Sequence, residues 1–123
     1  MSSRAEPAIR PRPRAKRPPA LQRHATVFAA LGDPTRLRLV TVLCTRGASS
    51  ITQLTAGTAI TRQAVTRHLQ VLADAGLVRD ARLGRERRWS FEPAPLDAAR
   101  RSLEQVAQQW DQALERLRVQ VER

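Results

Sequence analysis

The strongest constraint on the fold lies in residues 60–88, which read ITRQAVTRHLQVLADAGLVRDARLGRERR. Thr61 is a good N-cap, because its hydroxyl can accept a hydrogen bond from a backbone N–H of the first helical turn. Apolar residues then recur at steps of four and three, which predicts one buried stripe: Val65, Leu69 and Leu72. Gly76 can adopt the left-handed conformation that ends a helix, and an arginine-rich segment follows at once. The stretch therefore predicts a short helix joined directly to a basic hairpin.

The outer face of this helix is polar and is not interrupted by an acidic residue. Its members are Arg62, Gln63, Thr66, Arg67 and Gln70. Guanidinium, amide and hydroxyl groups are the groups that contact base edges and phosphates of a DNA duplex. We expect Gln63, Thr66 and Arg67 to contact bases and phosphates, and Arg62 to contact phosphate.

Two helices are expected upstream. The first covers residues 21–31, and its apolar face before Gly32 consists of Val27, Phe28 and Leu31. Asp33 and Pro34 then supply the N-cap and the first position of a second helix, where proline is favoured. The second helix has an apolar stripe that we expect to be buried: Leu37, Leu39, Val40, Leu43 and Cys44.

Ser50 and Gln53 form the capping-box pattern that opens a third, short helix. Gly57 and Thr58 make the turn that separates this helix from the one that follows Thr61. A short helix, a turn and a second helix with a polar outer face is the helix-turn-helix arrangement. The second helix of such a unit enters the major groove of DNA.

The segment after the recognition helix predicts a β-hairpin. Residues 77–83 and 87–91 read as two strands around a turn that contains Arg85. We expect its arginines to enter the minor groove or to grip the DNA backbone: Arg85, Arg87 and Arg88. Arg85 lies at the tip and is the strongest candidate, whereas Arg87 and Arg88 point to opposite faces, which leaves one of them for another role.

A final helix is expected over residues 96–122. Its apolar residues follow steps of three and four and leave the charged side chains on the other side: Leu103, Val106, Trp110, Leu114, Leu117 and Val121. At about 1.5 Å per residue the helix would be on the order of 40 Å long, more than the small body before it can cover. Part of its apolar face therefore requires a partner, most simply a second copy of the chain.

The formal net charge of +11, from 22 Lys and Arg against 11 Asp and Glu, favours a polyanionic partner. Residues 1–23 hold seven basic residues and one acidic residue, whereas residues 93–123 hold five of each sign. The excess positive charge therefore belongs to the N-terminus and to the predicted DNA-reading part.

Residues 1–20 are rich in proline and arginine and poor in apolar bulk, so we expect a disordered basic arm before one domain at residues 21–123. Such an arm either adds phosphate or minor-groove contacts or is only a solubilising extension, and a charge run favours the second. The single cysteine excludes an internal disulfide, and neither a bilayer span nor a secretory signal is indicated, so we expect a cytoplasmic protein.

Four segments, in their order and spacing, resemble bacterial regulators of the ArsR (SmtB/ArsR) family: LGDPTRLRLV, TRQAVTRHLQVL, ADAGLV and RLGRERRWSF. The resemblance spans roughly residues 25–92. It implies a mainly α winged helix-turn-helix fold with four helices, a small β-hairpin and a fifth helix. It also implies a homodimeric repressor that blocks its own promoter region. The contact between copies would come from the first and last helices, at Val27, Phe28, Leu31, Leu103, Val106, Trp110, Leu114, Leu117 and Val121.

The chain departs from the metal-sensing members of that family. Those members carry a Cys-x-Cys pair before the recognition helix or paired Asp, His and Glu ligands on the last helix, but residues 51–57 contain no cysteine and residues 96–123 contain no histidine. We therefore expect no metal site and no cofactor, and no pattern points to an effector ligand. We expect Cys44 to be a small buried apolar residue and His68 to bond to a neighbouring helix.

These patterns lead to a sequence-specific, DNA-binding transcriptional regulator that acts as a homodimeric repressor at an imperfect inverted repeat. An enzyme is not indicated, because the chain shows no paired nucleophile and base and no phosphate-binding glycine loop. The alternative is a winged-helix module that binds a protein or RNA and reads no DNA sequence. Equal affinity for an operator and for a scrambled duplex would identify that alternative.

Overall fold

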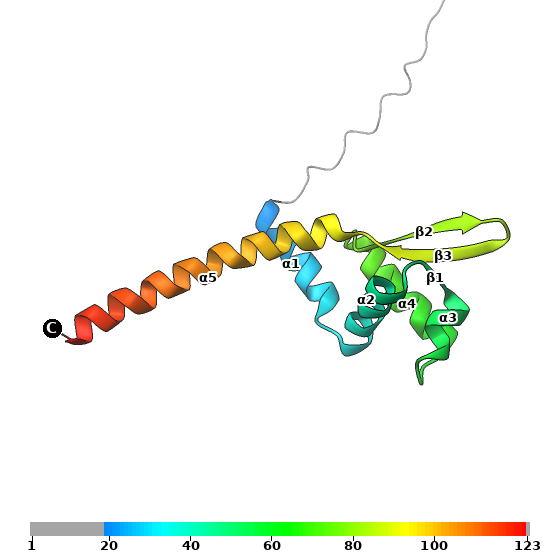
Figure 1. Cartoon of the computed structure of the whole chain (residues 1–123), viewed down its shortest axis with the longest axis horizontal. Coiled ribbons are helices and arrows are strands. Elements are labelled where there is room, and N and C mark those ends of the chain that lie inside the picture. The colour runs from blue at the N-terminus through cyan, green and yellow to red at the C-terminus, as the bar shows by residue number, and fades with distance from the viewer. Residues whose placement is uncertain (1–18, 123) are drawn as a thin grey trace, which may run out of the picture.

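Figure 1 shows a small helical body from which a long helix and a β-hairpin extend in opposite directions. This computed structural model describes residues 19–122. Its elements are α1 (Ala20–Leu31), α2 (Pro34–Arg46), β1 (Ser49–Ser50), α3 (Ile51–Ala56), α4 (Arg62–Asp74), β2 (Val78–Leu83), β3 (Glu86–Phe91) and α5 (Pro93–Glu122). The predicted mainly α, winged helix-turn-helix class is confirmed. The arm expected at residues 1–20 lies outside the described residues except at its end, where Ala20 already begins α1.

Local sequence signals begin three of the helices, as predicted. Asp33 caps α2 by accepting two backbone N–H groups of the next turn. The N–H of Arg36 is the main cause that lowers the pKa of the Asp33 carboxyl below its ordinary value. Ser50 and Gln53 bond each other's backbone in a complete capping box at α3, and Thr61 caps α4. Each cap satisfies N–H groups that have no partner within the helix.

Glycine ends α4 and turns the hairpin. Gly76 has a φ of +79°, the left-handed conformation predicted for it. In the hairpin Leu83 pairs with Glu86, so the turn contains only Gly84 and Arg85. The second strand thus begins one residue earlier than expected. Gly84 has a φ of +67°, as a two-residue hairpin turn requires.

A third strand, not predicted from the sequence, completes the sheet in the order β1-β3-β2. Ser49 pairs with Trp89, and Ser50 pairs with Arg88. Two polar residues carry no alternating pattern, and they become a strand only because the chain passes along the free edge of β3. The sheet therefore ties the hairpin to the start of the helix-turn-helix.

The core lies where α1, α2, α3 and α4 meet the sheet and the first turns of α5. Its largest fully buried side chains are Leu39, Leu69, Leu72, Leu77 and Val65. Two members of the stripe predicted for α2 are not in the core: Leu37 is 50% exposed, and Cys44 is exposed. They are seven residues apart and so share one side of the helix, which the rest of the described chain leaves uncovered. The expectation that Cys44 is buried was wrong.

Helix α5 begins at Pro93, three residues before the expected start, because prolines fit the first turn of a helix. Its 30 residues correspond to about 45 Å. The first part packs against α1, and Ala99 is the buried residue of α5. The remaining turns project beyond the body in Figure 1.

Candidate nucleic-acid interface

The recognition helix α4 has two sharply different faces. The buried face consists of Val65, Leu69 and Leu72, each 0% exposed. The five residues of the predicted reading face are all exposed: Arg62, Gln63, Thr66, Arg67 and Gln70. The burial of the apolar stripe thus forces the polar face outward, where a DNA groove can receive it.

The side chains of this face differ in how free they are. Gln63 and Arg67 form no hydrogen bond or ion pair with any residue between 19 and 122. The Gln70 side chain instead donates to Asp74 Oδ1 at 3.0 Å. Asp74 lies one turn further along α4, so an acid does border the face at its C-terminal end. Gln63 and Arg67 are therefore the residues best prepared to bind an external partner.

Helix α3 adds two residues that the sequence analysis did not assign to the interface. Arg62 donates from Nη2 to Thr52 Oγ1 at 3.0 Å. Ile51 lines a shallow groove together with Arg62, Gln63, Thr66 and Arg67. In a helix-turn-helix the first helix lies across the second. The short separation of α3 and α4 in the sequence was therefore the signal that could have predicted Ile51 and Thr52 as part of the interface.

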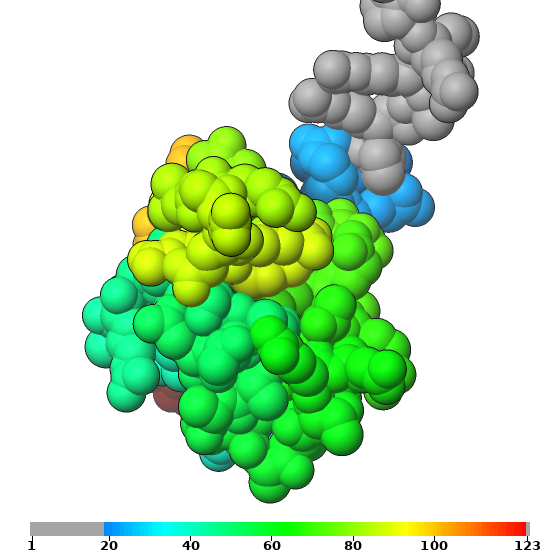
Figure 2. Space-filling view, turned by 90° about the vertical axis from the view of Figure 1, so that its right-hand side faces the viewer, coloured from blue at the N-terminus to red at the C-terminus, as the bar shows by residue number. Residues whose placement is uncertain are grey.

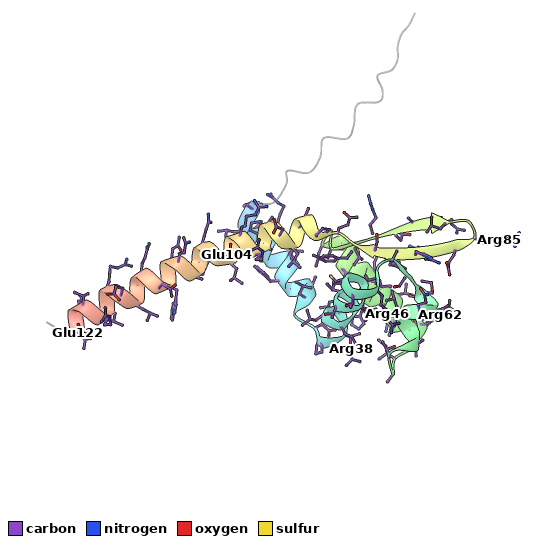
Figure 3. All side chains as sticks on the ribbon, in the orientation of Figure 1. Arg38, Arg46, Arg62, Arg85, Glu104 and Glu122 are labelled. Carbon is purple, nitrogen blue, oxygen red and sulfur yellow. The ribbon has the colours of Figure 1, made fainter. Side chains whose placement is uncertain are left out.

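The tip of the hairpin presents unpaired positive charge. Arg85 is exposed at the turn, and Figure 3 shows it pointing away from the body. Arg82, which was not predicted as a contact, is also exposed and faces Arg87 across the strands. Neither Arg82 nor Arg85 has a hydrogen-bond or ion-pair partner among the described residues.

The other two predicted wing arginines already have partners within the hairpin. Arg87 pairs with Asp80, and its guanidinium lies 4.8 Å from the centre of the Trp89 ring. Arg88 pairs with Glu86 at 2.8 Å. Exposed pairs of this kind contribute about 0–1 kcal/mol, so a phosphate could replace either acid. Arg87 and Arg88 are nevertheless less prepared for DNA than Arg85.

The recognition helix and the wing share one end of the molecule. In Figure 2 the hairpin lies over the surface formed by α3 and α4 on the face seen from that end. Figure 3 places Arg38, Arg46, Arg62 and Arg85 on the body and the hairpin, whereas Glu104 and Glu122 lie along α5. A basic head is thus separated from a long helix of mixed charge.

An exposed apolar strip runs along that long helix, and its residues are those predicted to contact a second copy. Its members are Leu103 (54% exposed), Val106 (51%), Trp110 (64%), Leu114 (47%), Leu117 (56%) and Val121 (77%). On α1, Phe28 is 36% exposed and Leu31 is partly buried. Val27, also predicted at this contact, is 4% exposed and belongs to the core of its own chain, so it offers almost no surface to a second copy.

His68 bonds to a neighbouring helix, as predicted, through Arg36 Nη1 at 3.3 Å from its Nδ1. Between residues 19 and 122, His, Cys, Asp and Glu side chains nowhere gather in the groups of three that could hold a metal ion. In the same part of the chain, each helix is too short or too polar to cross a bilayer.

The helix-turn-helix, its exposed polar face and the arginine-tipped hairpin define a winged helix-turn-helix DNA-binding protein. A helix-turn-helix domain family matches residues 31–81. The HTH-type transcriptional regulator YuzN of Bacillus subtilis is 41% identical over 76 residues, which cover 57% of this chain and 83% of YuzN. Two further relatives bear on the family to which this chain belongs.

The first of these is the ArsR-like transcriptional regulator from Rhodococcus sp. RHA1. Its structure superposes with a TM-score of 0.70 at 36% identity, covering 79% of this chain and 91% of that chain. The second is the arsenical resistance operon repressor of Bacillus subtilis, which is 32% identical over 71 residues. That match covers 58% of this chain and 65% of the repressor. The match to the Rhodococcus regulator shows that the chain belongs to the ArsR family of transcriptional regulators, which confirms the family that the sequence segments resembled.

Proposed function

We propose that this regulator is a homodimeric repressor that binds an imperfect inverted repeat in promoter DNA. Two α4 helices, related by a twofold axis, would enter successive major grooves about 34 Å apart. Bound in this way, the dimer would exclude RNA polymerase from the promoter by steric overlap. The proposed place of action is the bacterial cytoplasm, where promoter DNA is accessible.

The observation that carries the proposal is that the side chains of Gln63 and Arg67 on α4 are exposed and have no hydrogen-bond or ion-pair partner among the described residues. Amide and guanidinium groups can each form two hydrogen bonds with one base edge, so they distinguish bases where a lone ammonium would not. Thr66 lies beside them and adds a hydroxyl. Arg62 donates to Thr52 at the start of the helix, and we propose that it contacts a phosphate. The proposed base contacts are therefore Gln63, Thr66 and Arg67.

The apolar strip of α5 supports the proposed dimer. It contains a tryptophan and five other large apolar side chains that are 47% to 77% exposed, and water solvates such surface poorly. The charges beside the strip form pairs within α5, such as Arg100 with Asp97 and Arg118 with Glu115. Because these charges neutralise one another, two copies can approach without net repulsion. Phe28 of α1 would extend the contact towards the body.

Footprinting on the intergenic DNA upstream of the gene tests the proposal as a whole. A protected inverted repeat, with half-sites one helical turn or a multiple of it apart, is the expected result. Competition by scrambled duplex of the same length measures specificity at moderate salt, because salt suppresses the part of binding that reads no sequence. Equal affinity for the two duplexes would count against sequence-specific repression.

Replacing Arg67 by alanine is expected to weaken binding to the footprinted operator by roughly 1 to 3 kcal/mol for each half-site and to reduce discrimination against scrambled duplex. The reason is the loss of a guanidinium that reaches a base edge. Gel-shift titrations of both duplexes measure the effect. The matched control is Arg116→Ala, which removes an equal charge from the exposed surface of α5. If Arg67→Ala and Arg116→Ala bind the operator with the same affinity, Arg67 does not contact a base.

Replacing Arg85 by alanine is expected to change salt dependence more than specificity. A wing arginine that neutralises one phosphate contributes roughly 0.9 to the slope of log affinity against log salt, so its loss from both copies of the proposed dimer should make the slope shallower by about two. Arg82→Ala should show the same type of change, since Arg82 is likewise unpaired near the tip. Titrations over a series of salt concentrations measure both slopes. If both variants show the same salt dependence as the wild type, the wing arginines do not contact DNA phosphates.

A further inference from the structure

One arginine outside the proposed interface joins three helices. Arg36 of α2 donates from Nε to the carbonyl of Ala30 at 2.6 Å and from Nη2 to the carbonyl of Ala29 at 3.4 Å. Both carbonyls lie at the C-terminal end of α1, where a cation is favoured, and the carbonyl of Ala29 also accepts the backbone N–H of Gly32 at 3.1 Å. The remaining Nη1 lies 3.3 Å from Nδ1 of His68, which is on the recognition helix. Arg36 thus connects α1 to α4.

The direction of the bond to His68 follows from its chemistry. Arginine has only donors, so a hydrogen bond between these two groups requires Nδ1 of His68 to be the acceptor. Asp33 Oδ2 lies 3.9 Å from the same Nδ1, which is too long for a hydrogen bond. That oxygen already accepts the N–H groups of Thr35 and Arg36. His68 is therefore an acceptor held by Arg36.

This bond adds a directional constraint to the packing of α4. The buried stripe directs the polar face outward, but apolar contact has no directional preference, so it fixes the rotation of the helix about its own axis only coarsely. His68 lies between the reading face and the stripe, with its side chain 25% exposed. A rotation of about 15° would move a side-chain end at a radius of about 6 Å by roughly 1.5 Å. A shift of that size spoils two-point hydrogen bonding to a base edge.

We propose that Arg36 and His68 are positioning residues that hold α4 at the rotation needed for base reading, and that they tie this rotation to helix α1. The inference rests on the proposed base contacts of α4 and extends them to residues that touch no DNA. Because Phe28 of α1 is 36% exposed and belongs to the proposed contact between copies, the same link would couple assembly of the dimer to the angle of the recognition helix.

The test measures the ratio of affinities for the footprinted operator and for scrambled duplex. His68→Leu removes the acceptor and fills similar space, and it is expected to lower the ratio by about tenfold, the loss of roughly one good base contact. His68→Asn places Oδ1 close to the former position of Nδ1 and is expected to restore the ratio to within about twofold of the wild type. Thermal melting of each variant reports whether the fold is intact.

A second pair of variants keeps the charge constant. Arg36→Lys retains a cation but loses the planar guanidinium that donates to three acceptors. The ratio of the affinities for operator and scrambled duplex is therefore expected to fall by about tenfold, as in His68→Leu. Arg38→Lys is the matched control, because Arg38 is an exposed arginine of the same helix. It should leave the ratio unchanged. This pair decides the matter if His68→Leu does not fold.

The outcomes separate this inference from the proposed function. A wild-type protein that does not prefer the operator contradicts the proposed function itself. A wild-type preference that survives unchanged in both His68→Leu and Arg36→Lys, with unaltered melting, overturns the positioning role alone. A loss in His68→Asn as large as that in His68→Leu would likewise overturn it, because the acceptor would then not be the group that matters.

Discussion

Replacing Trp110 by aspartate is expected to convert the proposed dimer into monomers. Trp110 lies in the middle of the apolar strip of α5 and is 64% exposed in the single chain. Burying a surface of that size contributes about 2 to 4 kcal/mol per copy, and the change also places a charge at the contact. With both copies altered, the dissociation constant should rise by about a thousandfold or more. Sedimentation or light scattering at micromolar concentration measures the change.

The matched control for this variant is Val119→Asp. Val119 is 44% exposed and lies nine residues further along, which places it on the opposite side of the same helix. It should leave the dimer intact. The Trp110→Asp monomer should also bind the operator far more weakly than the control, because each monomer engages one half-site without the effective concentration that the second half-site provides. A Trp110→Asp protein that remains dimeric would show that the copies meet elsewhere.

Replacing Leu69 by alanine is expected to lower the free energy of unfolding by about 2 to 5 kcal/mol. Leu69 is 0% exposed and packs at the centre of the core, on the helix that carries the reading face. The cost combines lost burial with a cavity that the surrounding side chains fill only in part. For a domain of this size that loss is a large part of the total stability. Urea unfolding followed by circular dichroism measures it.

Val71→Ala on the same helix is the control for Leu69→Ala. Val71 is 41% exposed, so its truncation removes little buried surface and should change the free energy of unfolding by less than about 1 kcal/mol. Similar losses for the two variants would mean that the apolar stripe of α4 does not anchor the recognition helix in solution.

Much of the recognition unit was predictable from the chain alone because its signals are local. A cap such as Asp33 or Thr61 acts on N–H groups within three residues of itself. The stripe through Leu69 follows from the helical period, and Gly76 is the residue type that tolerates a left-handed turn. Once one face of α4 is apolar, the opposite face must carry Gln63 and Arg67 outward.

The tertiary structure decided the features that depend on distant partners. Arg36 and His68 are 32 residues apart, and no pattern around either one reports the bond between them. Strand β1 exists only beside β3, and Leu37 is exposed because the described chain does not cover that side of α2. The pairing of Arg87 with Asp80 arises from the register of the hairpin.

The sequence by itself therefore determined which segments are helical, which caps begin α2, α3 and α4, and which face of the recognition helix is polar. Only the tertiary structure decided which of the candidate arginines remain unpaired and which side chains hold the recognition helix in place. The physical reason is that caps, periodicity and backbone preference act over a few residues. Burial and ion pairing depend instead on which surfaces the fold brings together.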